Sequence, residues 1–177
     1  MQQIKVGLIG YGMAGRVFHA PVITAVPGLR LAKVVERRAD TARERYPWVE
    51  IVREVDALLG DSGIELVVIA TPSASHFELA ERALLADKHV VVDKPFTLTA
   101  EQAQRLIDLG GRQNRLISAF QNRRWDGDFQ TVSEIVRQGY LGRLVEYESH
   151  FDRFRNHFSP ERAWREQAGP GSGILFD

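Results

Sequence analysis

A lysine between an aspartate and a proline ends a run of valines in "HVVVDKPF", residues 89–96. A lysine that is partly desolvated, or that lies beside another cation, gives up its proton more readily, which favours proton exchange with a substrate hydroxyl near neutral pH. Pro95 restricts Asp93 and Lys94 to an extended approach, and a cis Lys94–Pro95 bond would hold the ammonium group in one direction. Position alone explains Lys94 equally well as a solvated residue at a strand end.

A second candidate is the glycine pattern G-x-G-x-x-G in "GLIGYGMAG", with glycines at Gly10, Gly12 and Gly15. An apolar strand precedes this pattern and a helical segment follows it, as in dinucleotide-binding loops. Gly10 would permit the tight turn, Gly12 the close approach to pyrophosphate and Gly15 the packing of the helix. Met13 and Ala14 lie between these glycines, where free N–H groups would hold phosphate oxygens. The alternative is a plain strand-to-helix turn with incidental glycines.

An acidic residue, Glu36, ends the next expected strand 21 residues after Gly15. A carboxylate there suits hydrogen bonds to both ribose hydroxyls and repels a 2′-phosphate, which favours NAD. The neighbouring Arg37 and Arg38 complicate this prediction, because either guanidinium would pair with a 2′-phosphate and favour NADP. All three residues would also fit the solvated start of a helix. The cofactor is therefore expected to be NAD or NADP.

The elements that position these residues follow from short β-branched runs that alternate with helix-periodic segments over the first two thirds of the chain. This alternation predicts βαβ units, and hence an α/β fold with a doubly wound parallel sheet. The expected strands are Ile4 to Ile9, Leu29 to Glu36, Glu50 to Val52, Ile64 to Ala70, His89 to Val92 and Arg115 to Phe120.

In such a sheet, ligands bind outside the carboxyl ends of the strands. The candidate residues expected there are Thr71, Pro72, Ser73 and His76 after the fourth strand, Asp93 to Pro95 after the fifth, and Gln121, Asn122, Arg123, Arg124 and Trp125 after the sixth. We expect them to converge on one cleft. His76 is expected to begin a helix beside the cofactor rather than to catalyse. The other histidines show no metal-ligand spacing, so no metal is implied.

Helical patterns separate the expected strands. In "SHFELAERALLADK" one face carries Phe77, Ala80, Leu84 and Leu85. Thr99, with Gln102 three residues later, predicts the start of a helix that ends at Gly110. Pro21 removes a backbone donor within "AGRVFHAPVI", so that helix is expected to be short or kinked.

The pattern changes after residue 124, which divides the chain into a dinucleotide-binding domain (1–124) and the beginning of a second domain (125–177). Asp126 is expected to cap a helix that ends at Gly139. The following "RLVEYESHF", residues 143–151, alternates apolar and polar side chains like a half-exposed strand of a mixed or antiparallel sheet. One strand makes no sheet, so we expect this second domain to be incomplete.

Composition limits the functional classes. The chain has 177 residues, 44% of them hydrophobic, and its 23 basic residues are balanced by 23 acidic ones. A packed core is attainable, and no overall charge would recruit nucleic acid or a membrane. There is no cysteine for a disulfide or thiolate metal site. The N-terminus enters a strand without a signal peptide, and the apolar runs are too short to span a bilayer, so we expect a cytoplasmic protein.

Six segments together resemble the glucose-fructose oxidoreductase, inositol dehydrogenase and MocA family: "GLIGYGMAGRVFHAP", "TPSASHFELA", "KHVVVDKPF", "NRRWDGDF", "ESHFDRFR" and "WREQAGPGSGILFD". The last motifs look closest to the branch with scyllo-inositol dehydrogenase-like proteins. The resemblance implies a Rossmann domain followed by an α/β domain with a large open sheet, in a chain about twice as long. It also implies a homo-oligomer, a dimer or tetramer, formed through that second sheet.

The resemblance also implies roles for single residues. The family's Glu-Lys-Pro motif falls on Asp93, Lys94 and Pro95, where the lysine is catalytic or orients the substrate and aspartate replaces glutamate with a shorter reach. The aspartate of the family's Asp and His pair matches Asp177, and its histidine would follow the last residue. Further residues implied at cofactor or substrate are Asn122, Arg123, Trp125, Trp164 and Arg165. Packing at a domain boundary is the alternative for this last set.

From these residues we expect an enzyme that transfers hydride between nicotinamide and a secondary alcohol of a sugar or cyclic polyol. Two alternatives remain at this point. One is a nicotinamide-binding regulator or subunit without turnover, because a dinucleotide fold does not prove chemistry. The other is an NAD-dependent glycosidase of the same family.

Overall fold

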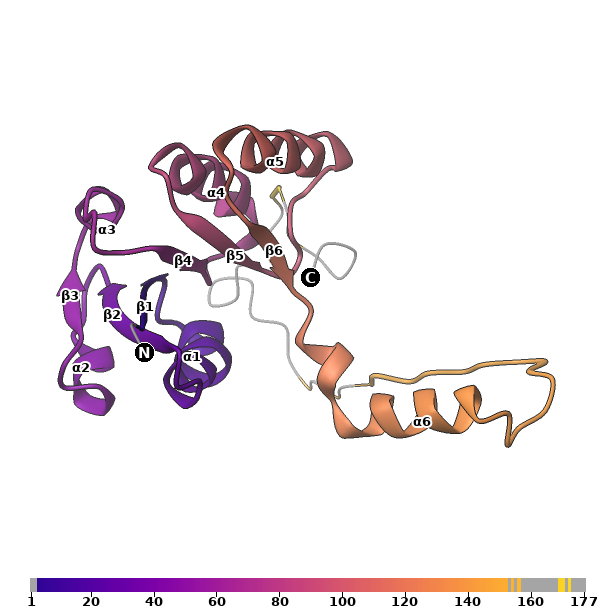
Figure 1. The fold of residues 1–177 in the computed structure, drawn as a ribbon. Helices are drawn as coiled ribbons and strands as arrows, with labels where there is room; N and C mark the ends of the chain where they lie inside the picture. Colours follow the sequence, from indigo (N-terminus) through magenta and orange to yellow (C-terminus); the bar gives the residue numbers. More distant parts are fainter. Residues whose placement is uncertain (1–2, 153, 155, 157–168, 171, 173–177) are drawn as a thin grey trace.

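The computed structural model describes residues 3–152, 154, 156, 169, 170 and 172. Its centre is a sheet of six strands in the order β3-β2-β1-β4-β5-β6, and every neighbouring pair is parallel (Figure 1). The strands are β1 (Ile4–Ile9), β2 (Leu29–Val35), β3 (Glu50–Val52), β4 (Leu66–Ile69), β5 (His89–Asp93) and β6 (Ile117–Phe120). The order reverses between β1 and β4, so the predicted doubly wound α/β fold is confirmed.

Helices cover both faces of this sheet. The α-helices are α1 (Ala20–Ala25), α2 (Thr41–Arg45), α3 (Val55–Leu59), α4 (His76–Leu85), α5 (Ala100–Gln113) and α6 (Gly127–Arg137). Shorter turns are η1 (Gly15–His19), η2 (Ser73–Ser75) and η3 (Asn122–Trp125). Helices α4 and α5 pack on one face, and α1 and α2 contribute to the core of the other (Figure 1).

The core is divided accordingly into two buried clusters. Strand β4 shows why, because its successive side chains point to opposite faces. Val67 and Ile69 belong to the cluster beneath α4 and α5, whereas Val68 belongs to the cluster that includes α1 and α2. A central strand buried on both faces reads as a continuous apolar run, as "LVVI" does here.

Local signals predicted some features of the helices correctly and others wrongly. Thr99 caps α5 by accepting a hydrogen bond from the Gln102 backbone N–H at 3.2 Å. That helix does not end at Gly110, because this glycine packs tightly below the Arg115 carbonyl and the left-handed residue is Asn114. Leu85 was expected on the buried face of α4 but is 60% exposed. The helix interrupted by Pro21 is short, as predicted.

The chain after β6 leaves the sheet. Helix α6 projects away from it, and the following segment returns alongside the helix without joining the sheet (Figure 1). The predicted strand over 143–151 is wrong for this structure, since these residues form no ladder with any described strand. A strand requires a hydrogen-bonded neighbour, which alternation alone does not supply. No helix among the described residues has the length and apolar character needed to cross a membrane.

Candidate functional site

The glycine loop joins β1 to η1 at the carboxyl edge of the sheet. Gly10 has a φ of +96°, and a Cβ atom there would lie 2.7 Å from the Ala70 carbonyl oxygen. At Gly15, a Cβ atom would lie 2.1 Å from the Gly10 carbonyl oxygen, so only glycine lets the helical turn pack against the loop. Gly12 is exposed with nothing within 4 Å of an added Cβ, and Met13 beside it is exposed. The loop is thus crowded inward and open outward.

This arrangement fits a dinucleotide. The first and third glycines allow the turn and the packing, while the second leaves room for a pyrophosphate to approach the backbone. Ala14 is half-buried next to this opening. The outward face of residues 12–14 is therefore where the free N–H groups at the start of the helical turn would meet phosphate oxygens.

Glu36, the carboxylate predicted to bind ribose, lies just after β2. Its carboxylate accepts hydrogen bonds from the backbone N–H groups of Thr41 at 3.2 Å and Ala42 at 3.0 Å, and from the Thr41 hydroxyl. It therefore holds the start of α2 and is nearly buried. Arg37 and Arg38 are exposed and make no ion pair with the residues that the structure describes.

The segment after β4 packs against the glycine loop. The Thr71 side chain lies 3.2 Å from the position of a Cβ atom on Gly10, and its hydroxyl is 2.7 Å from the Ser75 hydroxyl. Ser73 is buried, and Pro72 is exposed at the rim. The glycine loop and the end of β4 therefore form one contiguous surface at this edge.

His76 begins α4, as predicted, and is 1% exposed. Its Nδ1 atom lies 2.7 Å from the Pro95 carbonyl oxygen and its Nε2 atom 2.9 Å from that of Thr71. A neutral imidazole carries one N–H and donates to one of the two, whereas an imidazolium donates to both. In either form, the ring links the end of β4 to the turn after β5.

That turn carries the candidate lysine. The Lys94–Pro95 peptide bond is cis, and the Lys94 backbone N–H donates to Asp93 Oδ1 at 2.9 Å. Lys94 is exposed at the edge of the sheet. Burial acts to raise the pKa of the Asp93 carboxyl, but the nearby His19 ring and the Lys94 N–H outweigh it and hold the pKa below its usual range. Asp93 is thus a carboxylate at neutral pH.

The residues after β6 lie more openly. Asn122 is half-buried, whereas Trp125 is 78% exposed. Arg123 donates to Asp126 at 2.8 Å, and its guanidinium lies 5.3 Å from the centre of the Phe151 ring. Asp126 occupies the position before α6 but makes no capping hydrogen bond with its side chain. Trp164, Arg165 and Asp177 lie outside the described residues.

One residue at this edge escaped the sequence prediction. His19, at the end of η1, is 3% exposed and lies 3.6 Å from Asp93 Oδ1 through its Nε2 atom. The sequence placed it near the glycine loop but gave no sign of its distant partner, because the contact forms only when η1 packs across the sheet beside β5. Among the described residues, no group of three or more His, Asp or Glu side chains is arranged to hold a metal ion.

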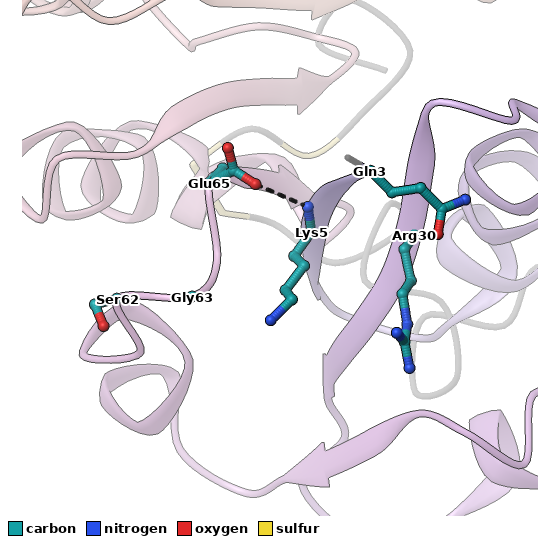
Figure 2. Close-up of a pocket in the computed structure, with 6 residues that line it drawn as sticks. All are labelled: Gln3, Lys5, Arg30, Ser62, Gly63 and Glu65. Carbon is teal, nitrogen blue, oxygen red and sulfur yellow. Dashed lines mark hydrogen bonds between the residues drawn. The ribbon is translucent and has the colours of Figure 1, made fainter. Parts of the chain in front are cut away.

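A separate hollow of about 480 Å³ lies at the amino edge of the sheet (Figure 2). Its lining residues are Gln3, Lys5, Arg30, Ser62, Gly63 and Glu65. Glu65 accepts a hydrogen bond from the Lys5 backbone N–H at 3.2 Å (Figure 2). Because the strands are parallel, this hollow is at the end opposite the glycine loop and Lys94.

Two family models match the chain. The model described as "Oxidoreductase family, NAD-binding Rossmann fold" covers residues 4–120, and the one described as "GFO/IDH/MocA C-terminal domain" covers residues 129–177. The first alone covers more than half of the chain.

Individual relatives agree with this. The chain is 49% identical to the uncharacterized oxidoreductase YdgJ of Escherichia coli K12, over 98% of this chain and 50% of that protein. It is 36% identical to scyllo-inositol 2-dehydrogenase (NADP(+)) IolW of Bacillus subtilis 168, over 98% of this chain and 48% of that protein. The solved structure of an oxidoreductase from Yersinia pestis matches with a TM-score of 0.87 at 45% identity, over 99% of this chain and 49% of that one.

The chain thus spans about half the length of the relatives it matches. Both the parallel sheet with its glycine loop and the identity to these oxidoreductases lead to the same assignment. The chain belongs to the GFO/IDH/MocA family of NAD(P)-dependent oxidoreductases.

Proposed function

We propose that the whole protein oxidises a secondary alcohol of a sugar or cyclic polyol, or reduces the corresponding ketone, with a nicotinamide cofactor. The observation that carries this proposal is that the glycine loop and the Lys94 turn meet at one edge of the sheet. His76 and Thr71 connect the two through hydrogen bonds and packing. The name of IolW, an inositol dehydrogenase, supports a polyol substrate.

The individual residues have separate roles in this reaction. When bound, the nicotinamide supplies the chemistry of accepting or giving a hydride. Lys94 hydrogen-bonds the reacting oxygen and exchanges its proton, and Asp93 holds the lysine backbone in place. Asn122 binds cofactor, and Arg123, Trp125 and Asp177 contact substrate. Trp164 and Arg165 are assigned to the nicotinamide site, and the second domain would pair copies of the protein into a dimer or tetramer.

The cofactor is NADP in preference to NAD. The Glu36 carboxylate is already occupied by the start of α2, which weakens the case for its binding both ribose hydroxyls. Arg37 and Arg38 are exposed and without ion-pair partners among the described residues, so both are available to a 2′-phosphate. The NADP dependence in the name of IolW supports the same choice.

Cofactor titrations test this choice. Removing both guanidinium groups with Arg37→Ala and Arg38→Ala should weaken NADP binding about 10-fold or more, the scale of a lost charge-assisted contact, and leave NAD within about 2-fold. Glu36→Gln retains an acceptor for α2 and serves as the control for the carboxylate charge. Tighter binding of NAD than NADP by the unmodified protein would contradict the preference.

Removal of the Lys94 side chain tests the chemistry. Lys94→Ala should lower turnover of a polyol at least about 100-fold while cofactor affinity stays within about 3-fold, because the lysine acts on the reacting oxygen. Lys5→Ala is the matched control, since Lys5 lies at the opposite edge of the sheet. Unchanged turnover in Lys94→Ala would refute the role of the lysine.

The same assays separate the alternatives. Reduced cofactor that accumulates with a polyol supports the dehydrogenase. Tight cofactor binding without reaction of any sugar or polyol would instead indicate a regulator. Release of free sugar without net cofactor reduction would indicate a glycosidase.

A further inference from the structure

A buried histidine, His19, lies next to the turn that carries Lys94. His19 is 3% exposed, and its ring centre is 4.2 Å from that of Phe120 at the end of β6. Its Nε2 atom has no hydrogen-bond partner among the described residues, and the nearest charged atom is Asp93 Oδ1 at 3.6 Å. A buried ring nitrogen without a hydrogen bond lowers the stability of the fold, so its position beside Asp93 calls for an explanation.

The acceptor of this contact is the residue that holds Lys94. The same oxygen, Asp93 Oδ1, accepts the Lys94 backbone N–H at 2.9 Å. The carboxyl is only 18% exposed, so the orientation it adopts depends mainly on protein groups. A group that fixes the orientation of the Asp93 carboxylate therefore also fixes the backbone of Lys94, through this hydrogen bond.

We propose that His19 is a positioning residue: its Nε2 atom, 3.6 Å from Asp93 Oδ1, closes to hydrogen-bond distance in solution, donates its N–H to Asp93 and thereby fixes the backbone of Lys94. This hydrogen bond would hold the lysine at a fixed position relative to the glycine loop. Gly15 is packed against Gly10, and η1 runs directly from Gly15 to His19. The loop, His19, Asp93 and Lys94 then form one chain of contacts across the sheet.

This arrangement explains how an aspartate works at this position. A carboxylate on a short side chain reaches less far than a longer one, and the imidazole of His19 lies 3.6 Å from it. The charged or titratable groups that face Asp93 are His19 from η1, Lys94 from its own turn and His76 from α4. His76 holds the other end of the turn through the Pro95 carbonyl oxygen.

The alternative is that His19 only fills space against Phe120. Two substitutions at the same position separate the alternatives. His19→Gln retains an N–H donor close to the place of Nε2, whereas His19→Leu keeps a similar volume without any donor. Space filling predicts that the two variants behave alike, and positioning predicts that only the glutamine preserves the contact.

The first measurement uses the cofactor-free protein and needs no turnover. Hydrogen exchange of the Lys94 amide, followed by NMR, should be about 10-fold faster in His19→Leu than in the unmodified protein or His19→Gln, since opening of this hydrogen bond controls exchange. Asp93→Ala should accelerate it at least as much, and adding His19→Leu to Asp93→Ala should have no further effect. His89→Leu, at the amino end of the same strand, is the control and should leave Lys94 exchange unchanged.

A second measurement requires no substitution. Nitrogen NMR of the unmodified protein reports which ring nitrogen carries the proton, and the proposal requires a proton on Nε2 of His19. A ring protonated on Nδ1 alone would overturn it. Equal Lys94 exchange in His19→Leu and the unmodified protein would also overturn it; if His19→Leu does not fold, His19→Asn, which lacks a donor at that place, replaces it.

The kinetic consequence rests on the proposed function. His19→Leu should lower kcat about 10-fold with cofactor affinity within about 3-fold, and His19→Gln should restore most of kcat. Equal kcat in all three proteins would overturn the proposal. If the unmodified protein shows no turnover while the exchange pattern holds, the proposed reaction fails and the positioning contact stands.

Discussion

Two regions of the chain differ in how far their side chains are buried. They are the sheet region up to Phe120 and the segment from Gln121 to Asp152. All the buried hydrophobic side chains in the described residues lie between Val6 and Leu109. No residue from 121 to 152 is buried. Both regions contain regular helices with an apolar face, so the difference lies in what those faces meet.

Helix α4 lies against the sheet, whereas the apolar side chains of α6 remain accessible. Leu84 of α4 is 0% exposed, but Phe129, Val132 and Val136 of α6 are 49%, 43% and 38% exposed. Periodicity thus specifies a helix and its apolar face in both regions. Burial, and the stability that comes with it, depends on a partner surface, which among the described residues the sheet provides for α4 and not for α6.

The largest difference between the regions should appear on truncating apolar side chains. Leu84→Ala should lower the free energy of unfolding by about 3–4 kcal/mol, because the side chain is fully buried and its neighbours cannot close the cavity. Val136→Ala in α6 should change it by less than about 0.5 kcal/mol. Denaturant unfolding measures both values.

Leu85→Ala is the control within α4. Leu85 is adjacent to Leu84 but 60% exposed, so its truncation should resemble Val136→Ala rather than Leu84→Ala. A large loss for Val136→Ala would show that the face of α6 is covered in solution and would remove the contrast between the regions.

Ion pairs sharpen the same comparison. Lys33 of β2 is nearly buried and lies 2.8 Å from Asp61 and 3.3 Å from Glu50. The hydrogen bond to Asp61 raises the pKa of Lys33, and the same bond, followed by that of the Gly63 N–H, lowers the pKa of Asp61. In α6, Arg137 pairs with Glu134 at 2.7 Å, and both side chains are more than half exposed.

Asp61→Asn should therefore lower the free energy of unfolding by about 1–2 kcal/mol at pH 7, since it leaves a buried cation less well paired; the exposure of Asp61 keeps the loss below that of a fully buried pair. The lowered pKa of Asp61 means that its contribution is present above about pH 4 and is lost as the pH falls through the folded value. The raised pKa of Lys33 means that its contribution persists to about pH 10 and is lost above that.

Unfolding curves between acidic and neutral pH check this result. The difference between Asp61→Asn and the unmodified protein should shrink toward acidic pH. Glu134→Gln, the matched change in α6, should leave the midpoint unchanged at all pH values. A constant difference across the pH range would show that the Asp61 charge is not responsible.

Much of the sheet region could be predicted from the sequence, because the residues that determine its strands and turns lie close together in the chain. The six strands were predicted at the correct places, with differences of at most two residues at the ends of β2, β4, β5 and β6. The Gly10 turn and the Thr99 cap were predicted from spacing alone and are present. In these cases a residue type and its neighbours decide the conformation.

The predictions failed where contacts between residues far apart in the sequence determine the structure. Gly110 looked like a helix end, but its missing side chain is used for packing below Arg115, and the helix continues. The segment 143–151 alternates correctly but pairs with no strand among the residues that the structure describes. His19 was not recognised because its partner, Asp93, is far away in the chain. The roles of the site residues and the domain boundary near residue 124 remain predictions.

The smallest expected effect on stability comes from the residues that precede two helices, Thr99 before α5 and Asp126 before α6. Thr99 accepts the Gln102 N–H, and the Gln102 side chain in turn accepts the Leu98 N–H at 3.2 Å. Asp126 stands at the equivalent position of α6, but its carboxylate is paired with Arg123 and caps nothing. An N-terminal residue contributes to stability only when its side chain satisfies a free backbone N–H.

Thr99→Ala should accordingly lower the free energy of unfolding by about 1 kcal/mol, and Asp126→Ala by less than about 0.5 kcal/mol. Thr99→Ser retains the acceptor and should restore most of the loss. The contrast fails if Asp126→Ala costs as much as Thr99→Ala, because Asp126 would then cap α6 in solution. Removing Arg123 should release the Asp126 carboxylate, which could then cap α6. Asp126→Ala should therefore lower the free energy of unfolding more in the Arg123→Ala background than in the unmodified protein.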